Sequence, residues 1–405
     1  MSDAANGSRG RAFGTLAVQG PEPEPGSGEA GAPHAPPLFQ TTAFAFSEAA
    51  AAVAAFREGG EYIYSRLGNP TVRALERHVT CLETHPVERA PLRPDPSDVD
   101  SRFFASGMAA ISAVALGVAA GGRILCQDGI YGTTVAHLER LGEYGIRVDF
   151  VPAGELAPLR EAAEENPPAL VYVESPANPL LQVTDLRAVA EVARSVGAVL
   201  AVDSTFATPA LQRPLAWGAD LSVHSTTKFM SGHGVALGGV VSGRRELIES
   251  AIHPARTYFG GAPDPFAAWI TGLGLRTLAV RMERHALNAA ALAASLAGHA
   301  KVERVLYPDP ESLPDGQMAT GGPMVAFVVS GGQEEALRVI DRLEIATLAP
   351  TLGTLDTLVQ HPYTMSHGVL PEARRRALGI EPGLVRVSVG LEDPADILEA
   401  FHRAL

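Results

Sequence analysis

The chain has 405 residues, of which 46% are hydrophobic and 19% are charged, and its net charge is −13. A chain of this length fits roughly two or three domains of about 150 residues each, and its composition is that of a globular protein with a large core. The acidic balance and the lack of a long basic tract argue against a nucleic-acid partner.

The N-terminal region is predicted to be a disordered or flexible tail. Residues 1–36 are rich in Gly, Pro, Ala and Ser, so they can bury little apolar surface, and they lack the apolar run of a signal peptide. The most apolar helix-like stretch, MAAISAVALGVAA, has 13 residues, which is too short to span a bilayer. With only Cys81 and Cys126 as cysteines, the sequence predicts a cytoplasmic protein without a membrane partner.

From about residue 102, short apolar runs alternate with segments of helical periodicity such as DLRAVAEVARSVG. The predicted strands are RFFA, RILCQ, RVDFVP, ALVYVES, AVLAVDS, LSVHS and VALGGVVSG. This alternation predicts an α/β domain with a mostly parallel sheet covered by helices on both faces. In such sheets ligands bind beyond the carboxyl ends of the strands, so polar residues at those ends are the candidates for a site.

After residue 262 the pattern changes. A long helical stretch at 266–300 is followed by MVAFVVSG, EEALRVIDRL, RVSVGLED and a final helix. Strands and helices in this order predict a smaller α+β domain at the C-terminus.

Several well-known catalytic motifs are missing from the sequence. It contains no G-x-x-x-x-G-K-[ST], H-E-x-x-H, paired C-x-x-C or G-x-S-x-G, which argues against a phosphate-loop enzyme, a zinc protease and a serine hydrolase. No metal site is predicted.

A set of polar residues follows the predicted strand ends. Asp203 and Lys228 lie at or just beyond two of these ends, 25 residues apart, and Ser225 and Thr227 flank the lysine. That separation is about one strand–helix–strand step, so the acid and the lysine should lie on neighbouring strands.

Two further features precede this pair. Ser106 and Gly107 occupy a strand-to-helix turn, where free amides can bind a phosphate, and Tyr131 lies in the loop after the next strand. Pyridoxal phosphate (PLP) requires a lysine, an acid for its ring nitrogen, phosphate donors and a stacking aromatic. Each residue alone has an ordinary structural explanation, such as a helix cap or a turn, but their joint order favours a PLP site.

The chain resembles the PLP-dependent enzymes of cysteine and methionine metabolism from about residue 37 to the C-terminus. These include cystathionine γ-synthase, cystathionine γ-lyase, methionine γ-lyase and the O-acylhomoserine sulfhydrylases. The resemblance is carried by PLFQTTAF, YIYSRLGNPT, SGMAAI, YGTT, VESPANP, AVDSTFATP, SVHSTTKFMSGHG, LRTLAVRMERHALNA and VRVSVGLED.

The resemblance implies the fold of PLP-dependent transferases of type I, which is like that of aspartate aminotransferase. The expected organisation is a tail at 1–36, an N-terminal arm at 37–65, a PLP-binding large domain at 66–262 and a small domain at 263–405. It also implies a homotetramer, built as a dimer of dimers with active sites at the dimer interface.

The resemblance also assigns roles to individual residues. Lys228 would bond covalently to PLP and shuttle protons, and Asp203 would pair with the ring nitrogen. Tyr131 would stack on the ring and take part in acid–base steps. The expected phosphate ligands are Ser225, Thr227 and the amides of Gly107 and Met108, with Tyr64 and Arg66 coming from a partner subunit. The expected substrate-binding residues are Arg386, Asn178, Ser175 and Thr351. Glu174 stays open between a cofactor-side role and a structural one.

The departures from the family bear on the reaction. The lysine motif continues as GHGVALGG rather than the GHSD of synthases and cystathionine lyases, and HPYTMSH is also similar to the methionine γ-lyase and sulfhydrylase forms. Methionine γ-lyases often carry a cysteine where this chain has Thr133. We expect γ-elimination of a sulfur amino acid such as methionine or cystathionine, with γ-replacement on an O-acylhomoserine as the alternative.

Overall fold

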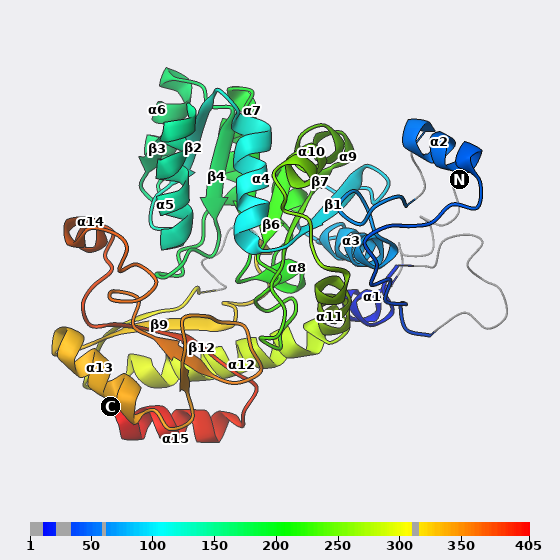
Figure 1. Cartoon of the computed structure of the whole chain (residues 1–405). Coiled ribbons are helices and arrows are strands. Elements are labelled where there is room, and N and C mark those ends of the chain that lie inside the picture. Colours follow the sequence, from blue (N-terminus) through cyan, green and yellow to red (C-terminus); the bar gives the residue numbers. More distant parts are fainter. Residues whose placement is uncertain (1–10, 22–33, 59–61, 310–315) are drawn as a thin grey trace.

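The computed structural model describes residues 11–21, 34–58, 62–309 and 316–405, and Figure 1 shows their arrangement. A large sheet of seven strands has the order β1-β7-β6-β5-β4-β2-β3. Strands β2 to β6 are parallel to one another, and β7 runs antiparallel to both β6 and β1. The strands are β1 (Val99–Phe104), β2 (Arg123–Gln127), β3 (Arg147–Val151), β4 (Leu170–Glu174), β5 (Val199–Asp203), β6 (Leu221–His224) and β7 (Gly239–Arg244).

The seven predicted strands therefore all form, and the mostly parallel sheet is confirmed. Alternate residues of β4 enter different cores: Leu170 and Tyr172 pack with α4 and α5, whereas Val171 and Val173 pack with α6 and α7. This is the period-2 alternation of a strand buried on both faces.

The helices and their caps follow ordinary sequence signals. Asn69 caps α3 by accepting from the Thr71 amide at 2.9 Å, with Pro70 as the first helical residue, as helix starts favour. The helices are α1 (Phe13–Gln19), α2 (Ala49–Glu58), α3 (Pro70–Glu83), α4 (Gly107–Ala119), α5 (Gly132–Arg140), α6 (Leu156–Glu165), α7 (Leu186–Ser195), α8 (Thr208–Leu211), α9 (Arg245–Leu247), α10 (His253–Tyr258), α11 (Pro265–Leu275), α12 (Leu278–Ala297), α13 (Gly332–Arg342), α14 (Glu372–Ala377) and α15 (Pro394–Ala404).

The C-terminal part forms a second, smaller sheet with the order β10-β11-β12-β9-β8. Helices α12, α13 and α15 pack with it around a separate core, and Figure 1 shows this layer below the large sheet. Its strands are β8 (Val302–Leu306), β9 (Met324–Val329), β10 (Thr347–Leu348), β11 (Leu358–Gln360) and β12 (Leu384–Ser388). The predicted α+β domain is confirmed in this region.

One expectation is wrong for part of the N-terminal tail. Residues 13–19 form α1, and its Leu16 and Ala17 are 2% and 0% exposed in the same core cluster as α3 and α12 residues. The short apolar run is hidden by the Gly- and Pro-rich composition around it, but its two buried side chains dock this helix of seven residues. The parts of the predicted tail at 1–10 and 22–33 lie outside the described residues. Within the described ranges, no helix is long and apolar enough to cross a membrane.

Candidate active site

The carboxyl ends of β4, β5 and β6 lie at the edge of the large sheet that faces the small domain. Glu174 on β4 and Asp203 on β5 are direct Cα partners, and His224 ends β6 just before Ser225. Residues from the small domain reach this edge from the other side. The candidate site therefore lies between the two sheets. It is at the carboxyl ends of the parallel strands, which is where such sheets bind their ligands.

Lys228 follows the end of β6, in the turn that begins at Ser225. Its Nζ donates to Thr351 Oγ1 at 2.8 Å, and Gly353 (φ 80°) packs so closely that a Cβ there would lie 2.8 Å from the Lys228 carbonyl carbon. Burial, with help from the charge of Arg386, lowers the pKa of Lys228 to about 8. A lysine of this kind supplies a neutral amine near physiological pH, as covalent chemistry with an aldehyde requires.

Asp203 is a buried acid, 6% exposed, at the end of β5. Its carboxylate accepts from the Thr205 amide at 3.0 Å, from the Thr205 hydroxyl at 2.6 Å and from the Tyr172 hydroxyl at 3.2 Å. These donors are neutral, and burial raises the pKa of Asp203. A cation placed against this carboxylate would offset the free-energy cost of burying its charge. The protonated ring nitrogen of PLP fits that requirement.

Glu174, which the sequence left open, is held beside Asp203. Its Oε1 accepts from the Asn178 amide at 2.7 Å and its Oε2 accepts from the Tyr131 amide at 3.1 Å. Burial, and then the neighbouring Asp203 charge, raise the pKa of Glu174 to about 8. Its carboxylate therefore links the backbone before α5, at Tyr131, to the backbone of the loop after β4, at Asn178.

The start of α4 provides a cradle for a phosphate. Ser106 caps the helix by accepting from the Ala109 amide at 3.1 Å. The Gly107 and Met108 amides are the first two of the helix. A Cβ on Gly107 would lie 2.7 Å from the Cβ of Ser225, so only glycine lets this helix end come so close to Ser225. The residues present thus fit the phosphate of PLP.

Thr227, the other predicted phosphate ligand, is within the same strand-end segment. Its hydroxyl donates to the Gly238 carbonyl at 3.2 Å and accepts from the Gly238 amide at 3.0 Å. These bonds tie the lysine loop to the start of β7.

Arg386 on β12 and Asn178 form the candidate receptor for a carboxylate. The guanidinium is 3% exposed, and it donates to Asn178 Oδ1 at 2.7 Å and to the Thr351 carbonyl at 3.2 Å. Burial lowers its pKa to about 10, which leaves it charged at neutral pH. A buried arginine bonded to neutral acceptors suits the carboxylate of an amino acid.

Ser175 is fully buried next to this receptor. Its hydroxyl accepts from the Thr184 amide at 3.2 Å, and its carbonyl accepts from Gln212 at 2.7 Å. The observed bonds of Ser175 are those of a residue that anchors the loop between β4 and α7, which carries Asn178.

Tyr131 lies at the start of α5 with 37% of its surface exposed. Tyr64 lies in the segment predicted as the N-terminal arm and Arg66 follows directly after it, and both are exposed. The Arg66 guanidinium lies 5.6 Å from the centre of the Tyr64 ring and donates to the Thr257 carbonyl at 3.3 Å. Within one chain, these contacts place them with the arm and α10.

Sequence reasoning gave no role to His367, which the structure brings to the site. Its Nε2 lies 3.1 Å from the Ile130 carbonyl, immediately before Tyr131. The HPYTMSH motif marked this segment as similar to the family. It could not predict the contact between His367 and Ile130, which are 237 positions apart.

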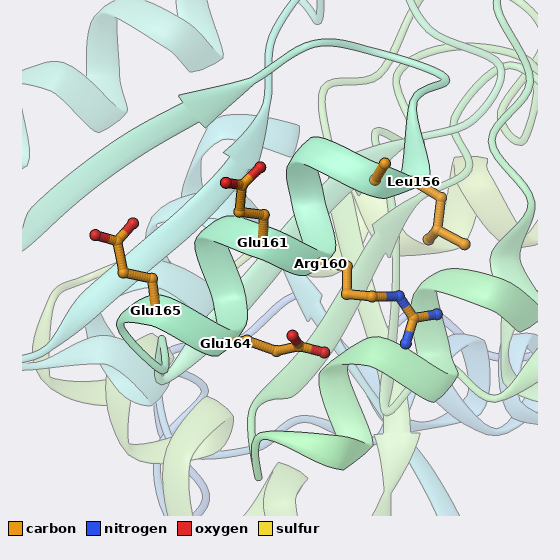
Figure 2. Close-up of a pocket in the computed structure, with 6 residues that line it drawn as sticks. Leu156, Arg160, Glu161, Glu164 and Glu165 are labelled. Carbon is orange, nitrogen blue, oxygen red and sulfur yellow. The ribbon is translucent and has the colours of Figure 1, made fainter.

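An open pocket of about 590 Å³ lies elsewhere, along α6. Figure 2 shows its side chains projecting from that helix, and they are Leu156, Ala157, Arg160, Glu161, Glu164 and Glu165. None of the site residues lines it, and its acidic face does not suit an anionic cofactor.

Comparisons with known proteins agree with this geometry. The model of the family described as Cys/Met metabolism PLP-dependent enzyme matches residues 15–405. O-succinylhomoserine sulfhydrylase of Pseudomonas aeruginosa is 40% identical over 98% of this chain and 96% of its own length. L-methionine gamma-lyase of Treponema denticola is 36% identical over 92% of both chains. The crystal structure of cystathionine gamma synthase from Xanthomonas oryzae pv. oryzae, 32% identical, superimposes with a TM-score of 0.86 over 97% of both chains.

Proposed function

The chain belongs to the Cys/Met metabolism PLP-dependent enzymes, and we propose that it catalyses γ-replacement on an O-acylhomoserine with a sulfur nucleophile. PLP, when bound, supplies an electron sink that makes protons of the attached amino acid acidic. In the proposed reaction the bond between Cγ and the acyl oxygen breaks, a Cγ–S bond forms, and the acyl group leaves as a carboxylate.

The residues of the site suit the first half of this reaction. Arg386 and Asn178 bind the substrate carboxylate and so fix the amino acid relative to Lys228. The Lys228 amine, with its lowered pKa, accepts the α-proton and returns a proton later. The Thr351 hydroxyl accepts a hydrogen bond from the same amine, and Tyr131, which is 37% exposed, takes part in the acid–base steps.

The observation that carries the choice is the sulfhydrylase relative, which covers 98% of this chain at 40% identity. Thr133 supports it, because this position carries a cysteine in many methionine γ-lyases. The γ-elimination of methionine or cystathionine, which the sequence analysis put first, stays the second candidate. It is supported by the methionine gamma-lyase relatives and by the shared first half of the chemistry.

One assay separates the two reactions. Purified holoenzyme is incubated with O-succinylhomoserine or O-acetylhomoserine, with and without sulfide, and in parallel with methionine and cystathionine. We expect homocysteine from an O-acylhomoserine plus sulfide at a rate at least about tenfold above α-keto acid formation from methionine. Faster α-keto acid formation from methionine or cystathionine would establish γ-elimination instead. No product from any of these substrates would refute both.

We also propose the expected assembly, a homotetramer of two catalytic dimers in the cytoplasm. The predicted arm supports it, since its Leu38, Phe39 and Phe56 expose 39%, 42% and 70% of their surface. Tyr64 and Arg66, at the end of this segment, are exposed too. Both cysteines are free, which suits a reducing compartment. Light scattering of the holoenzyme at several concentrations tests the assembly, and a stable monomer would contradict it.

A further inference from the structure

One peptide unit in the site is held from both sides. The carbonyl of Ile130 accepts from His367 Nε2 at 3.1 Å, and the amide of the next residue, Tyr131, donates to Glu174 Oε2 at 3.1 Å. Glu174 ends β4 in the large domain, whereas His367 follows β11 in the small domain. The backbone that carries the Tyr131 ring is therefore clamped between the two domains.

The clamp is buried and closely packed. His367 and Ile130 are 0% exposed and Glu174 is 5% exposed. A Cβ on Gly132 would lie 2.7 Å from the Ser366 carbonyl, so the small-domain segment lies directly on the turn that begins α5. A shift of this segment would have to move Tyr131 with it, because close-packed interiors transmit displacements.

The contact with Ile130 decides which ring nitrogen of His367 carries a hydrogen. Since Nε2 faces a carbonyl oxygen, it must carry the hydrogen. Nδ1 lies 3.0 Å from Ser366 Oγ. Burial lowers the pKa of His367 to about 4, so the ring is neutral and its Nε2–H points to the Ile130 carbonyl.

Glu174 extends the clamp to the substrate receptor. Its other oxygen accepts from the Asn178 amide at 2.7 Å, and the Asn178 side chain accepts from Arg386 at 2.7 Å. One carboxylate thus fixes the distance between the Tyr131 backbone and the group that receives the substrate carboxylate.

We infer that His367 and Glu174 are positioning residues for Tyr131, which they hold at a set place between the small domain and the carboxylate receptor. This inference rests on the role of Tyr131 in the proposed function. Neither side chain is required to touch the reacting atoms.

The test compares three variants of the holoenzyme. His367→Leu removes the bond to Ile130, and His367→Gln retains an N–H donor near the position of Nε2. His361→Leu is the matched control, because His361 is a buried histidine of the same HPYTMSH motif whose partners, Thr364 Oγ1 at 2.8 Å and the Pro382 carbonyl at 2.7 Å, are both in the small domain.

Two readouts are measured. Hydrogen–deuterium exchange of the peptide covering 128–135 should rise about tenfold in His367→Leu and stay near the wild-type rate in His361→Leu. The value of kcat should fall about ten- to hundredfold in His367→Leu with KM changed less than about threefold, since a misplaced catalytic group slows the reaction more than it weakens binding. His367→Gln should recover most of both losses.

Equal effects of His367→Leu and His361→Leu on exchange and on kcat would overturn the inference, as would unchanged exchange at 128–135 in His367→Leu. The exchange readout does not depend on which substrate the enzyme uses. If exchange rises as expected but no tested substrate turns over in the wild type, the clamp stands as a structural feature and the proposed reaction fails. If the wild type turns over and exchange is unchanged, the inference alone fails.

Discussion

Glu174 and Asp203 face each other as Cα partners at the carboxyl ends of two parallel strands. Both are buried acids, and burial raises the pKa of each, for Glu174 to about 8. Two carboxylates at adjacent strand ends in a dry site cannot easily both be ionised. The electrostatics of this edge therefore favour a bound cation, and they make the protein without PLP sensitive to pH.

The first prediction concerns that sensitivity. A group whose pKa is higher in the folded than in the unfolded chain stabilises the fold below its unfolded pKa of 4.5, and the contribution is lost as pH rises through about 8. The Glu174→Gln side chain cannot ionise. In the PLP-free protein, the melting temperature of Glu174→Gln minus that of the wild type should therefore increase from pH 5 to pH 8. Thermal melts at several pH values check this, with Glu303→Gln as an exposed control. A constant difference between Glu174→Gln and the wild type would contradict it.

The second prediction concerns the rate at which PLP attaches. Only the neutral amine of Lys228 can attack an aldehyde, and its pKa is lowered to about 8. The rate constant for attachment to the PLP-free protein should fall about tenfold per pH unit below 8 and level off above it. Stopped-flow absorbance measures the rate, and Lys228→Ala gives the background. A rate that keeps rising to pH 10 would show an ordinary lysine.

The third prediction concerns the close approach of Gly107 to Ser225. Gly107→Ala would place a methyl group 2.7 Å from the Ser225 Cβ, which would push the start of α4 away from the lysine segment. PLP affinity should fall about tenfold or more, because the proposed phosphate donors separate. Gly272→Ala is the control, since its Cβ would meet nothing within 4 Å. PLP titration measures both affinities, and equal values would refute the phosphate cradle.

Much of the large domain could be predicted because its signals are local. The central strands β4 and β5 are apolar runs, and Asp203 sits at the end of its own run. A strand–helix–strand step was therefore enough to place it on the strand next to β6, which leads to Lys228. Thr351 and Arg386 are different, because they approach Lys228 from the small domain. Their place could be expected only from the resemblance to a family.

The missed features have a common physical cause. Glu174 acts through two backbone amides and His367 through a carbonyl, and backbone partners leave no trace in residue identity. Helix α1 was missed because only Leu16 and Ala17 are buried in a Gly- and Pro-rich region. The signal lies in packing against distant helices, not in the segment itself.

The fourth prediction concerns the carboxylate receptor. Arg386→Lys keeps a charge but loses the planar fork that bonds to Asn178 and can bind a carboxylate with two hydrogen bonds. KM for the amino-acid substrate should rise about ten- to hundredfold, the value of a lost charged hydrogen bond. Arg304→Lys is the control, because its ion pair with Glu381 is exposed and worth little. A KM unchanged in Arg386→Lys would place the receptor elsewhere.

The fifth prediction tests whether Arg66 serves the active site of a partner subunit. Arg66→Ala and Lys228→Ala should each be nearly inactive alone. If the arm crosses the dimer interface, a mixed dimer has both defects in one site and none in the other. Random re-association of equal amounts should then restore about a quarter of wild-type activity. Activity is measured after joint denaturation and refolding of the two variants, with each variant refolded alone as the control. If Arg66 serves its own chain, every site carries a defect and the mixture stays inactive.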